Sequence, residues 1–531
     1  MAQLMLLFFV LLAAIVTTPL AERIGLPQPV LMTVIGIVLA LVPAVPNISL
    51  EPGLILPLVL PPLIYAAAQR STARYFRANV RVILLLAVAL VVVTTAVVAV
   101  AAHWIVPALP LGAAIALGAI ISPPDPIAAA AVAGSVGLPR RLMGILETEG
   151  LFNDVTALVV YGLAVDAVVS GEFSTLQAVE RLVLSAVLAL VFGVGLGWLS
   201  GRVMSVLDDP TLQVALSLLV PFAAYSLAEG LHGSGVLAVL VCSLWINDRT
   251  VGADDVAYRL VGSAFWDVVE LLISGMAFGL IGLELASVLA ETGRHNWRSM
   301  LVDAGLVMAV VAGVRLLWLL PGAWVTYRWD RRRGVREEAA PIGWRESVVL
   351  WWSGMRGVAS VALALAIPFT VKGGGTFPGR DEIVFIAFSV VLFTLLVQGM
   401  TLSWVVRKLH LSRDEDAEDA AERLLWYRVS KAGLRRLKAL AESEDLPDEL
   451  VERLRQRQTD RLARNRPDLY DEEQRRELKE RVRRLRQFQQ VEQEMLAAGR
   501  EEMQVARMEP GADPELVDRV IRKLDIRSAP Q

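Results

Sequence analysis

The chain has 531 residues, 55% of them hydrophobic, and a formal net charge of −3. Soluble globular chains are usually about 45–50% apolar and lack runs of roughly 20 apolar residues, which recur here as far as about residue 406. The composition therefore excludes an ordinary soluble protein and predicts a polytopic helical membrane protein. The single cysteine, Cys242, excludes an internal disulfide. Because neither HExxH nor CxxC occurs, we expect no metal site built from His or Cys, and no cofactor.

The apolar segments predict about thirteen membrane spans. They are residues 3–20, 27–43, 52–68, 82–105, 111–135, 142–169, 176–200, 212–231, 233–247, 261–288, 300–325, 346–370 and 381–406. The first is interpreted as a transmembrane helix, because its apolar run is long for a signal peptide and no basic residues precede it.

Loop charge predicts the orientation of these spans. With the N-terminus outside and the C-terminus inside, the inner loops carry sixteen Lys and Arg residues and the outer loops five. Cytoplasmic loops are enriched in Lys and Arg, so this orientation is favoured. An even number of spans would break the alternation of inner loops rich in Lys and Arg with outer loops that carry few. The loop charges therefore also support thirteen spans.

From residue 407 onward the sequence becomes rich in Arg, Glu, Leu and Gln at helical spacing. Segments such as DLPDELVERLRQRQ and DPELVDRVIRKLD begin with an acidic cap and keep an apolar stripe. We therefore divide the chain into a membrane domain, 1–406, and a cytoplasmic helical tail, 407–531. The tail is interpreted either as a solvated appendage that packs on itself or dimerises, or as a regulator of the membrane domain.

The fifth span contains ISPPDPIAAAAV, residues 121–132, which cannot form an unbroken helix. Its three prolines lack N–H groups, so carbonyls around Ala119 to Ser122 lose their partners. Irregular backbone at membrane depth occurs only where it lines a cavity or is buried in protein. Backbone oxygens of Ser122 and Pro124 beside the Asp125 carboxylate make a hard-oxygen site that would suit a small alkali cation, and Asp125 is predicted to bind the cation or the proton. A simple proline kink with Asp125 as an N-cap is the alternative, and both can hold.

The sixth span opens with ETEGLFNDVTALVVYG, residues 147–162, and so brings carboxylates into the membrane. Each costs about 2.5–3.5 kcal/mol at the centre of a span. Glu149 and Asn153 share a helix face, whereas Asp154 lies about 140° around the helix from Glu149. We interpret Glu149 as part of a structural ion pair and Asp154 as the group that faces a cavity. Glu147, near an interface, is left unassigned.

The twelfth span contains WWSGMRGVASVALALAIP, residues 351–368, in which Arg356 lies between Gly354 and Gly357. An arginine cannot lose its proton and must find an acid, and Glu149 is the expected partner. Arg315 and the other charges in the later spans are assigned to structural pairing. The interrupted fifth and twelfth spans are seven apart, as two inverted repeats of six with one linking span require.

At these residues the chain resembles the sodium/proton exchanger branch of the monovalent cation:proton antiporters, in its bacterial form. The resemblance covers the membrane region and, more loosely, the tail. It is carried by LPPLIYAAA (60–68), ISPPDPIAAAAVAG (121–134), ETEGLFNDVTALVVYGL (147–163), LHGSGVLAV (231–239), FWDVVELLISGMAFGLIGLEL (265–285) and GMRGVASVALALAIP (354–368).

The resemblance implies an all-α fold of thirteen helices with inverted repeats and two crossed, unwound helices, in a homodimer in the inner (plasma) membrane. It implies that Asp154 is the carboxylate shared by Na⁺ and H⁺, with Asn153 beside it. It places Asp125 in the unwound crossing and pairs Glu149 with Arg356. The implied activity is secondary Na⁺/H⁺ antiport for pH and sodium homeostasis, with the cation, the proton and the bilayer as partners and no nucleic acid.

Three positions depart from the pattern of the family. Pro124 replaces a residue that is often Thr, Gly150 one that is often Ser, and Ala66 one that is often acidic. Three possible cation oxygens are therefore missing, which leaves the choice among Na⁺, Li⁺ and K⁺ open.

A carboxylate in a partly dry cavity holds either a proton or a cation, and Asn153 adds no second charge. We therefore expect electroneutral exchange of about one Na⁺ for one H⁺. The alternatives are a K⁺/H⁺ antiporter, a gated cation channel without proton coupling, and an intramembrane enzyme using Asp125 and Asp154 as a dyad. The chain lacks a TVGYG-like filter, and we expect a transporter, not an enzyme.

Overall fold

The computed structural model describes the chain as a helical protein in two compact units, Met1–Arg413 and Asp414–Gln531. The described residues are 2–42, 52–69, 80, 84–107, 109–125, 128–129, 137–171, 175–250, 256–291, 297–333, 343–372, 374–411, 415–444, 446–465, 472–507 and 513–528. Within them the only β feature is an isolated bridge between Thr370 and Thr376. The predicted all-α membrane fold is confirmed, and the predicted domain boundary falls inside α17 (Met400–Lys408).

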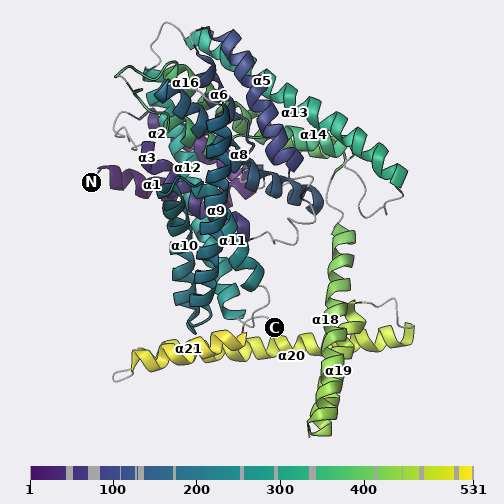
Figure 1. Cartoon of the computed structure of the whole chain (residues 1–531). Helices are drawn as coiled ribbons and strands as arrows, with labels where there is room; N and C mark the ends of the chain where they lie inside the picture. Colours follow the sequence, from purple (N-terminus) through teal and green to yellow (C-terminus); the bar gives the residue numbers. More distant parts are fainter. Residues whose placement is uncertain are drawn as a thin grey trace. The chain divides into compact units, whose positions relative to one another are not determined.

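The first unit consists of helices of very different lengths (Figure 1). Its other elements are α1 (Ala2–Ile24), α2 (Gln28–Ala40), α3 (Pro52–Gln69), η1 (Leu84–Ala89), α5 (Leu90–Ile105), α6 (Leu111–Ile121), α8 (Arg140–Ser170), α9 (Thr175–Met204), α10 (Pro210–Gly230), α11 (Gly235–Thr250), α12 (Val256–Glu291), α13 (Trp297–Arg333), α14 (Trp344–Trp352), α15 (Val358–Leu365), α16 (Arg380–Phe393) and η3 (Thr394–Gly399). The two η segments are π-helical: η1 leads directly into α5, and η3 lies between α16 and α17.

Seven helical stretches in the described residues are long and apolar enough to cross a bilayer. They are Leu84–Ile105, Leu142–Ser170, Val183–Met204, Pro210–Gly230, Val256–Glu284, Arg298–Gly322 and Arg380–Lys408. Shorter apolar helices occupy five more of the predicted spans, and the twelfth holds α14 and α15. Every predicted span therefore contains a helix, whereas the count of thirteen crossings stays a prediction.

The helices that carry the two sequence interruptions share one apolar core. α6 packs against α5, α8, α15 and α16. Leu117 and Ile121 of α6, Leu363 of α15 and Ile386 of α16 are fully or almost fully buried together in that core. This packing brings the end of α6 close to the start of α15, although more than 200 residues separate them in the sequence.

Glycines allow α2 and α12 to pack with their backbones in contact. A Cβ added to Gly282 would lie 2.2 Å from the carbonyl oxygen of Thr33 and 2.6 Å from the backbone nitrogen of Ile37. Small residues permit this approach in membranes, where van der Waals packing drives helix association.

We therefore expect Gly282→Ala to destabilise the membrane unit by about 1–3 kcal/mol, because backbone atoms would have to move apart. Thermal unfolding of the purified protein in detergent, monitored by size-exclusion chromatography, measures this loss of stability. Gly195→Ala in α9, where an added Cβ meets no atom within 4 Å, is the matched control. Equal stability of the two variants would contradict the close α2–α12 contact.

The second unit contains α18 (Glu415–Ser443), α19 (Asp448–Asn465), α20 (Glu472–Ala506) and α21 (Pro514–Ser528). α18 packs against α19, and α20 packs against α21. The acidic cap predicted for the last helix is present, since the Asp513 carboxylate accepts the backbone N–H of Glu515 at 2.9 Å. The tail therefore packs on itself, as one sequence interpretation stated, while its regulatory role stays a prediction.

Candidate functional site

The first interruption begins where α6 ends at Ile121. The backbone N–H of Asp125 leaves the helix and donates to the carbonyl of Met355 at 2.6 Å. The Asp125 carboxylate is 7% exposed and accepts the backbone N–H of Ala128 at 3.3 Å. Asp125 thus caps Ala128, one of the two described helical residues that follow the prolines, in line with the N-cap interpretation.

The second interruption lies between α14 and α15, where residues 353–357 are not helical. The other oxygen of the Asp125 carboxylate accepts the backbone N–H of Val358, the first residue of α15, at 3.1 Å. Exposed N–H groups at a helix start carry partial positive charge and favour a carboxylate. One buried side chain therefore joins the two interruptions by capping a helical segment in each.

Arg356 binds the carbonyls that the prolines leave free. Its Nε donates to Ile121 O at 2.8 Å and its Nη2 to Ser122 O at 3.3 Å, and its Nη1 donates to Gly354 O. Pro126 has no N–H to offer Ser122, and the N–H of Asp125 has gone to Met355 instead of Ile121. The guanidinium is 2% exposed and supplies donors in place of the missing backbone N–H groups.

Glu149 pairs with Arg315 of α13. Two hydrogen bonds join the guanidinium to the carboxylate, at 2.5 Å and 3.0 Å, and the side chains are 3% and 2% exposed. Arg315 also donates from Nε and Nη2 to Leu350 O at 3.3 Å and 3.1 Å. This bidentate geometry is the strong form of an arginine–carboxylate pair.

The expected direct pair of Glu149 with Arg356 is therefore wrong. Glu149 is an ion-pair member as predicted, but its cation comes from α13, and Arg356 uses carbonyl oxygens. The sequence assigns Arg315 to structural pairing but does not name it as the partner of Glu149. Arg315 lies within an apolar span and, like Arg356, cannot lose its proton, so it too required a buried partner.

Asn153 lies beside the first interruption. Its Nδ2 donates to Pro124 O at 2.8 Å, and the side chain is fully buried. Among the residues that the structure describes, no group donates a hydrogen bond to its Oδ1. The amide is thus oriented by the proline segment, with its oxygen left available as a ligand.

Asp154 is half-buried next to Asn153 and lies within electrostatic range of Asp125. No hydrogen bond or ion pair to its carboxylate is found within the described ranges, in contrast to Glu149 and Asp125. The helical spacing argument is therefore consistent with the structure. Glu149 faces a buried cation, and Asp154 projects elsewhere.

The two backbone oxygens named as possible ligands are already in use. Ser122 O accepts from Arg356, and Pro124 O accepts from Asn153, so each retains one further lone pair. The Ser122 hydroxyl shares a 3.0 Å hydrogen bond with the hydroxyl of Thr95. Both residues remain near Asp125, but neither carbonyl is an unoccupied ligand.

Ala66, where an acid was expected from the resemblance, lines a separate polar cavity of about 300 Å³. The cavity lies between α3, α11 and α12, and its polar lining residues include Gln69, Asn247, Asp267 and Glu270. A small apolar side chain therefore occupies a position that faces polar groups.

Interrupted helices that meet at buried charged side chains within a helical membrane unit are typical of secondary transporters. Residues 10–408 match the family described as sodium/hydrogen exchanger, transmembrane. The match covers most of the chain, and the chain belongs to this family.

Individual relatives support the same family assignment. An uncharacterized Na⁺/H⁺ exchanger of Mycobacterium tuberculosis is 34% identical over 464 residues, which are 85% of this chain and 82% of the relative. A sodium, potassium, lithium and rubidium/H⁺ antiporter of Bacillus pumilus is 31% identical over 420 residues, 76% of this chain and 62% of the relative. The structure of the sodium proton antiporter MjNhaP1 from Methanocaldococcus jannaschii aligns with a TM-score of 0.59 at 19% identity. That alignment covers 77% of this chain and 99% of the other and shows a shared fold.

Proposed function

We propose that the protein exchanges Na⁺ for H⁺ across the membrane. This proposal rests on a difference among the charged side chains of α8, α13 and the two interruptions: all but one of those named below have a hydrogen-bond or ion-pair partner. Glu149, Asp125, Arg315 and Arg356 are each held by named partners, whereas the Asp154 carboxylate is half-buried with no ion pair among the described residues. Membership of the sodium/hydrogen exchanger family supports the same activity.

Asp154 and Asn153 would hold the transported ion. A carboxylate oxygen and an amide oxygen are hard ligands that suit an alkali cation, and the Oδ1 of Asn153 lacks a protein donor within the described ranges. The Nδ2 contact with Pro124 fixes the amide so that its oxygen stays available. The carboxylate accepts either the cation or a proton. Because Asn153 contributes no charge, each half-cycle moves one charge, and exchange is electroneutral.

Asp125, which the sequence predicts as an ion-binding residue, would instead support the site without binding the ion. Its two oxygens receive backbone N–H groups from two helical segments, which stabilise its negative charge. Its charge also acts on Asp154, and so favours a positive ion, either the cation or a proton, at that carboxylate. Asp125 is therefore a positioning residue that holds the two interruptions together.

K⁺/H⁺ exchange is the second candidate. Pro124, Gly150 and Ala66 each lack a side-chain oxygen, so the site would compensate less of the cost of removing water from the ion, and this cost is smaller for K⁺ than for Na⁺. The Bacillus pumilus relative is named for potassium as well as sodium. Comparing proton movement driven by Na⁺ with that driven by K⁺ in proteoliposomes decides between the two.

We place the protein in the inner membrane as a homodimer, with its N-terminus outside and its C-terminal tail in the cytoplasm. The arginine-rich inner loops and the odd number of predicted spans support this orientation.

Asp154→Asn is expected to abolish exchange and leave folding intact, because asparagine keeps the side-chain size but cannot bind and release a proton. Purified protein in proteoliposomes, with an imposed pH gradient and an internal pH-sensitive dye, is challenged with Na⁺, Li⁺ or K⁺. Asp166→Asn is the matched control, since Asp166 is exposed on the same helix. Cation-driven proton movement in the Asp154 variant would overturn the assignment. Dependence of the wild-type rate on membrane potential would overturn electroneutrality.

A further inference from the structure

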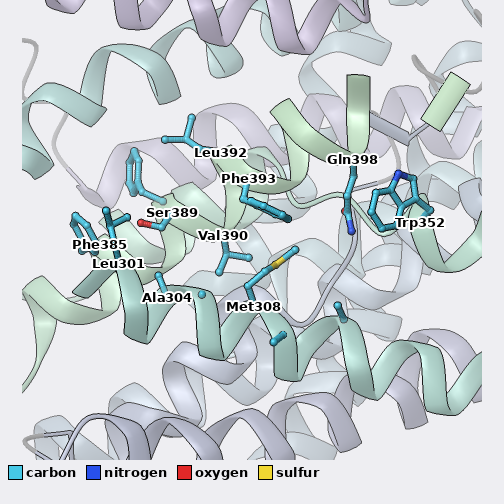
Figure 2. A pocket seen from close by; sticks show the side chains of 14 residues that line it. Leu301, Ala304, Met308, Trp352, Phe385, Ser389, Val390, Leu392, Phe393 and Gln398 are labelled. Carbon is cyan, nitrogen blue, oxygen red and sulfur yellow. The ribbon is translucent and has the colours of Figure 1, made fainter. Parts of the chain in front are cut away.

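An apolar cavity of about 560 Å³ shares no lining residue with the proposed ion site, and Figure 2 shows the side chains that line it. Its walls are α13, α16 and the π-helical segment η3, with Trp352 at the end of α14. Phe385, Phe388 and Phe393 contribute aromatic rings to the lining. A volume of this size with an apolar lining and few polar groups is typical of a small-molecule site.

The cavity lies along an apolar face of α13 that is exposed within a stretch long and apolar enough to cross a bilayer. Leu301, Gly305 and Ala309 line it and are exposed on the membrane unit, and Leu306 beside them is exposed too. Apolar residues that are exposed within a membrane-spanning helix contact the bilayer. A molecule dissolved in the bilayer can therefore reach the cavity without crossing water.

The length of the cavity is close to the thickness of the hydrocarbon layer in one leaflet of the bilayer. Its lining extends along α13 from Leu301, near the start of the membrane-crossing stretch, to Ala312 at the middle of that stretch. Eleven helical steps span about 16 Å, close to half of the roughly 30 Å hydrocarbon core. The cavity thus fits an elongated apolar chain.

The side chains with polar atoms that line the cavity are Trp352, Ser389 and Gln398, and the buried amide oxygen of Gln398 gives the cavity chemical selectivity. Gln398 lines it and is 3% exposed, and its Oε1 has no hydrogen-bond partner among the residues described. Buried acceptors without a donor are rare in proteins. An occupant with a single hydroxyl group would supply the donor, whereas a plain hydrocarbon chain would leave the oxygen unsatisfied.

The elements that line the cavity also contact the second interruption, residues 353–357, or lead directly into it. Trp352 is the last residue of α14, directly before it, and the Thr394 hydroxyl of η3 accepts the backbone N–H of Arg356 at 3.0 Å. On α13, Arg315 binds Leu350 O and Glu149. An occupant therefore touches three elements that fix the backbone around Arg356. π-Helical segments are frequent at functional sites.

We propose that this cavity binds a lipid-soluble alcohol, an apolar chain that carries one hydroxyl, and that binding changes the rate of exchange. The hydroxyl donates to Gln398, and the chain lies along α13 among the phenylalanines. The effect on rate depends on the proposed exchange function, whereas the binding does not.

Photolabelling tests the binding. The full chain in proteoliposomes is irradiated with a diazirine-bearing octanol, and the labelled residues are located by mass spectrometry. We expect labels within 301–312 and 385–398. Gly305→Phe should remove them by filling the cavity, since an added Cβ at Gly305 meets no atom within 4 Å. Gly313→Phe, at an equally open position on α13 outside the cavity, should keep them. Labels elsewhere, or equal labels in Gly305→Phe, would overturn the site.

Competition tests the hydroxyl. Excess octanol should displace the label from the wild type several-fold better than excess octane, and Gln398→Leu should remove this difference without changing the cavity volume greatly. Equal displacement by octane and octanol in the wild type would overturn the alcohol and leave a hydrocarbon chain as the occupant.

Transport tests the effect on rate. Added octanol should change the initial exchange rate at least about twofold in the wild type and in Gly313→Phe, but not in Gly305→Phe, a criterion that corresponds to about 0.4 kcal/mol. An equal response in all three would identify a bilayer effect and overturn regulation through the cavity. No exchange before octanol is added would refute the proposed function instead, while the photolabelling result would still stand.

Discussion

Gly357→Ala is expected to abolish exchange and to lower the stability of the membrane unit. A Cβ at this position would lie 1.5 Å from one carboxylate oxygen of Asp125 and 2.5 Å from its Cγ. The carboxylate cannot move away freely, because Ala128 and Val358 both donate to it. Ordinary overpacking costs about 1–3 kcal/mol, and this overlap exceeds it.

The measurement pairs initial exchange rates in proteoliposomes with thermal unfolding in detergent. We expect the rate to fall by more than about tenfold, equivalent to about 1.4 kcal/mol, with a clear loss of thermal stability. Gly162→Ala on α8, where an added Cβ meets no atom within 4 Å, should change neither quantity. Wild-type behaviour of Gly357→Ala would mean that the two interruptions do not meet at Asp125.

A second substitution separates the clash from other causes. Shortening Asp125 in the double variant Asp125→Ala/Gly357→Ala removes the two closest overlapping atoms and leaves only the Cβ of residue 125, 2.8 Å from the added Cβ. The thermal stability of the double variant should therefore exceed that of Gly357→Ala alone. Exchange should remain low, because the link between the two helical segments is lost. Additive losses of stability would instead show that Gly357 is needed for its own backbone conformation.

The interruptions could be predicted because their causes are local. A proline lacks its N–H wherever the chain places it, so the loss of partners around Ile121 and Ser122 followed from the sequence. The helical spacing of Glu149 and Asp154 is also local, and the structure gives Glu149 a buried cation without giving one to Asp154. Asp125 as an N-cap was among the interpretations for the same reason.

The partner of Glu149 could not be predicted in this way. Two arginines, Arg315 and Arg356, lie in apolar spans, and the sequence gives no distance from either to Glu149. The choice depends on how α8, α13 and the second interruption pack. The carbonyls freed by the prolines were predicted as ligands for a cation, but they also suit a guanidinium, and Arg356 takes two of them. The donors of Arg356 are then satisfied without an acid.

Arg315→Ala should therefore be more damaging than any single change that leaves Glu149 paired. It would leave a carboxylate that is 2% exposed without its cation, at a cost of about 3–5 kcal/mol. We expect little folded protein after extraction in detergent, or a strongly lowered midpoint of thermal unfolding. Glu149→Ala alone leaves Arg315 with the carbonyl of Leu350 and should cost less.

The double variant Glu149→Ala/Arg315→Ala should be more stable than Arg315→Ala alone, because it buries no unpaired charge. Thermal unfolding of all four proteins forms a double-mutant cycle that isolates the coupling between the two side chains. A coupling near zero would contradict the Glu149–Arg315 pair. If Glu149→Ala instead restored the stability of Arg356→Ala, the pairing first expected from the sequence would be correct. Since Arg356 donates to carbonyls and Arg315 holds the carboxylate, we expect rescue by Glu149→Ala only when the missing arginine is Arg315.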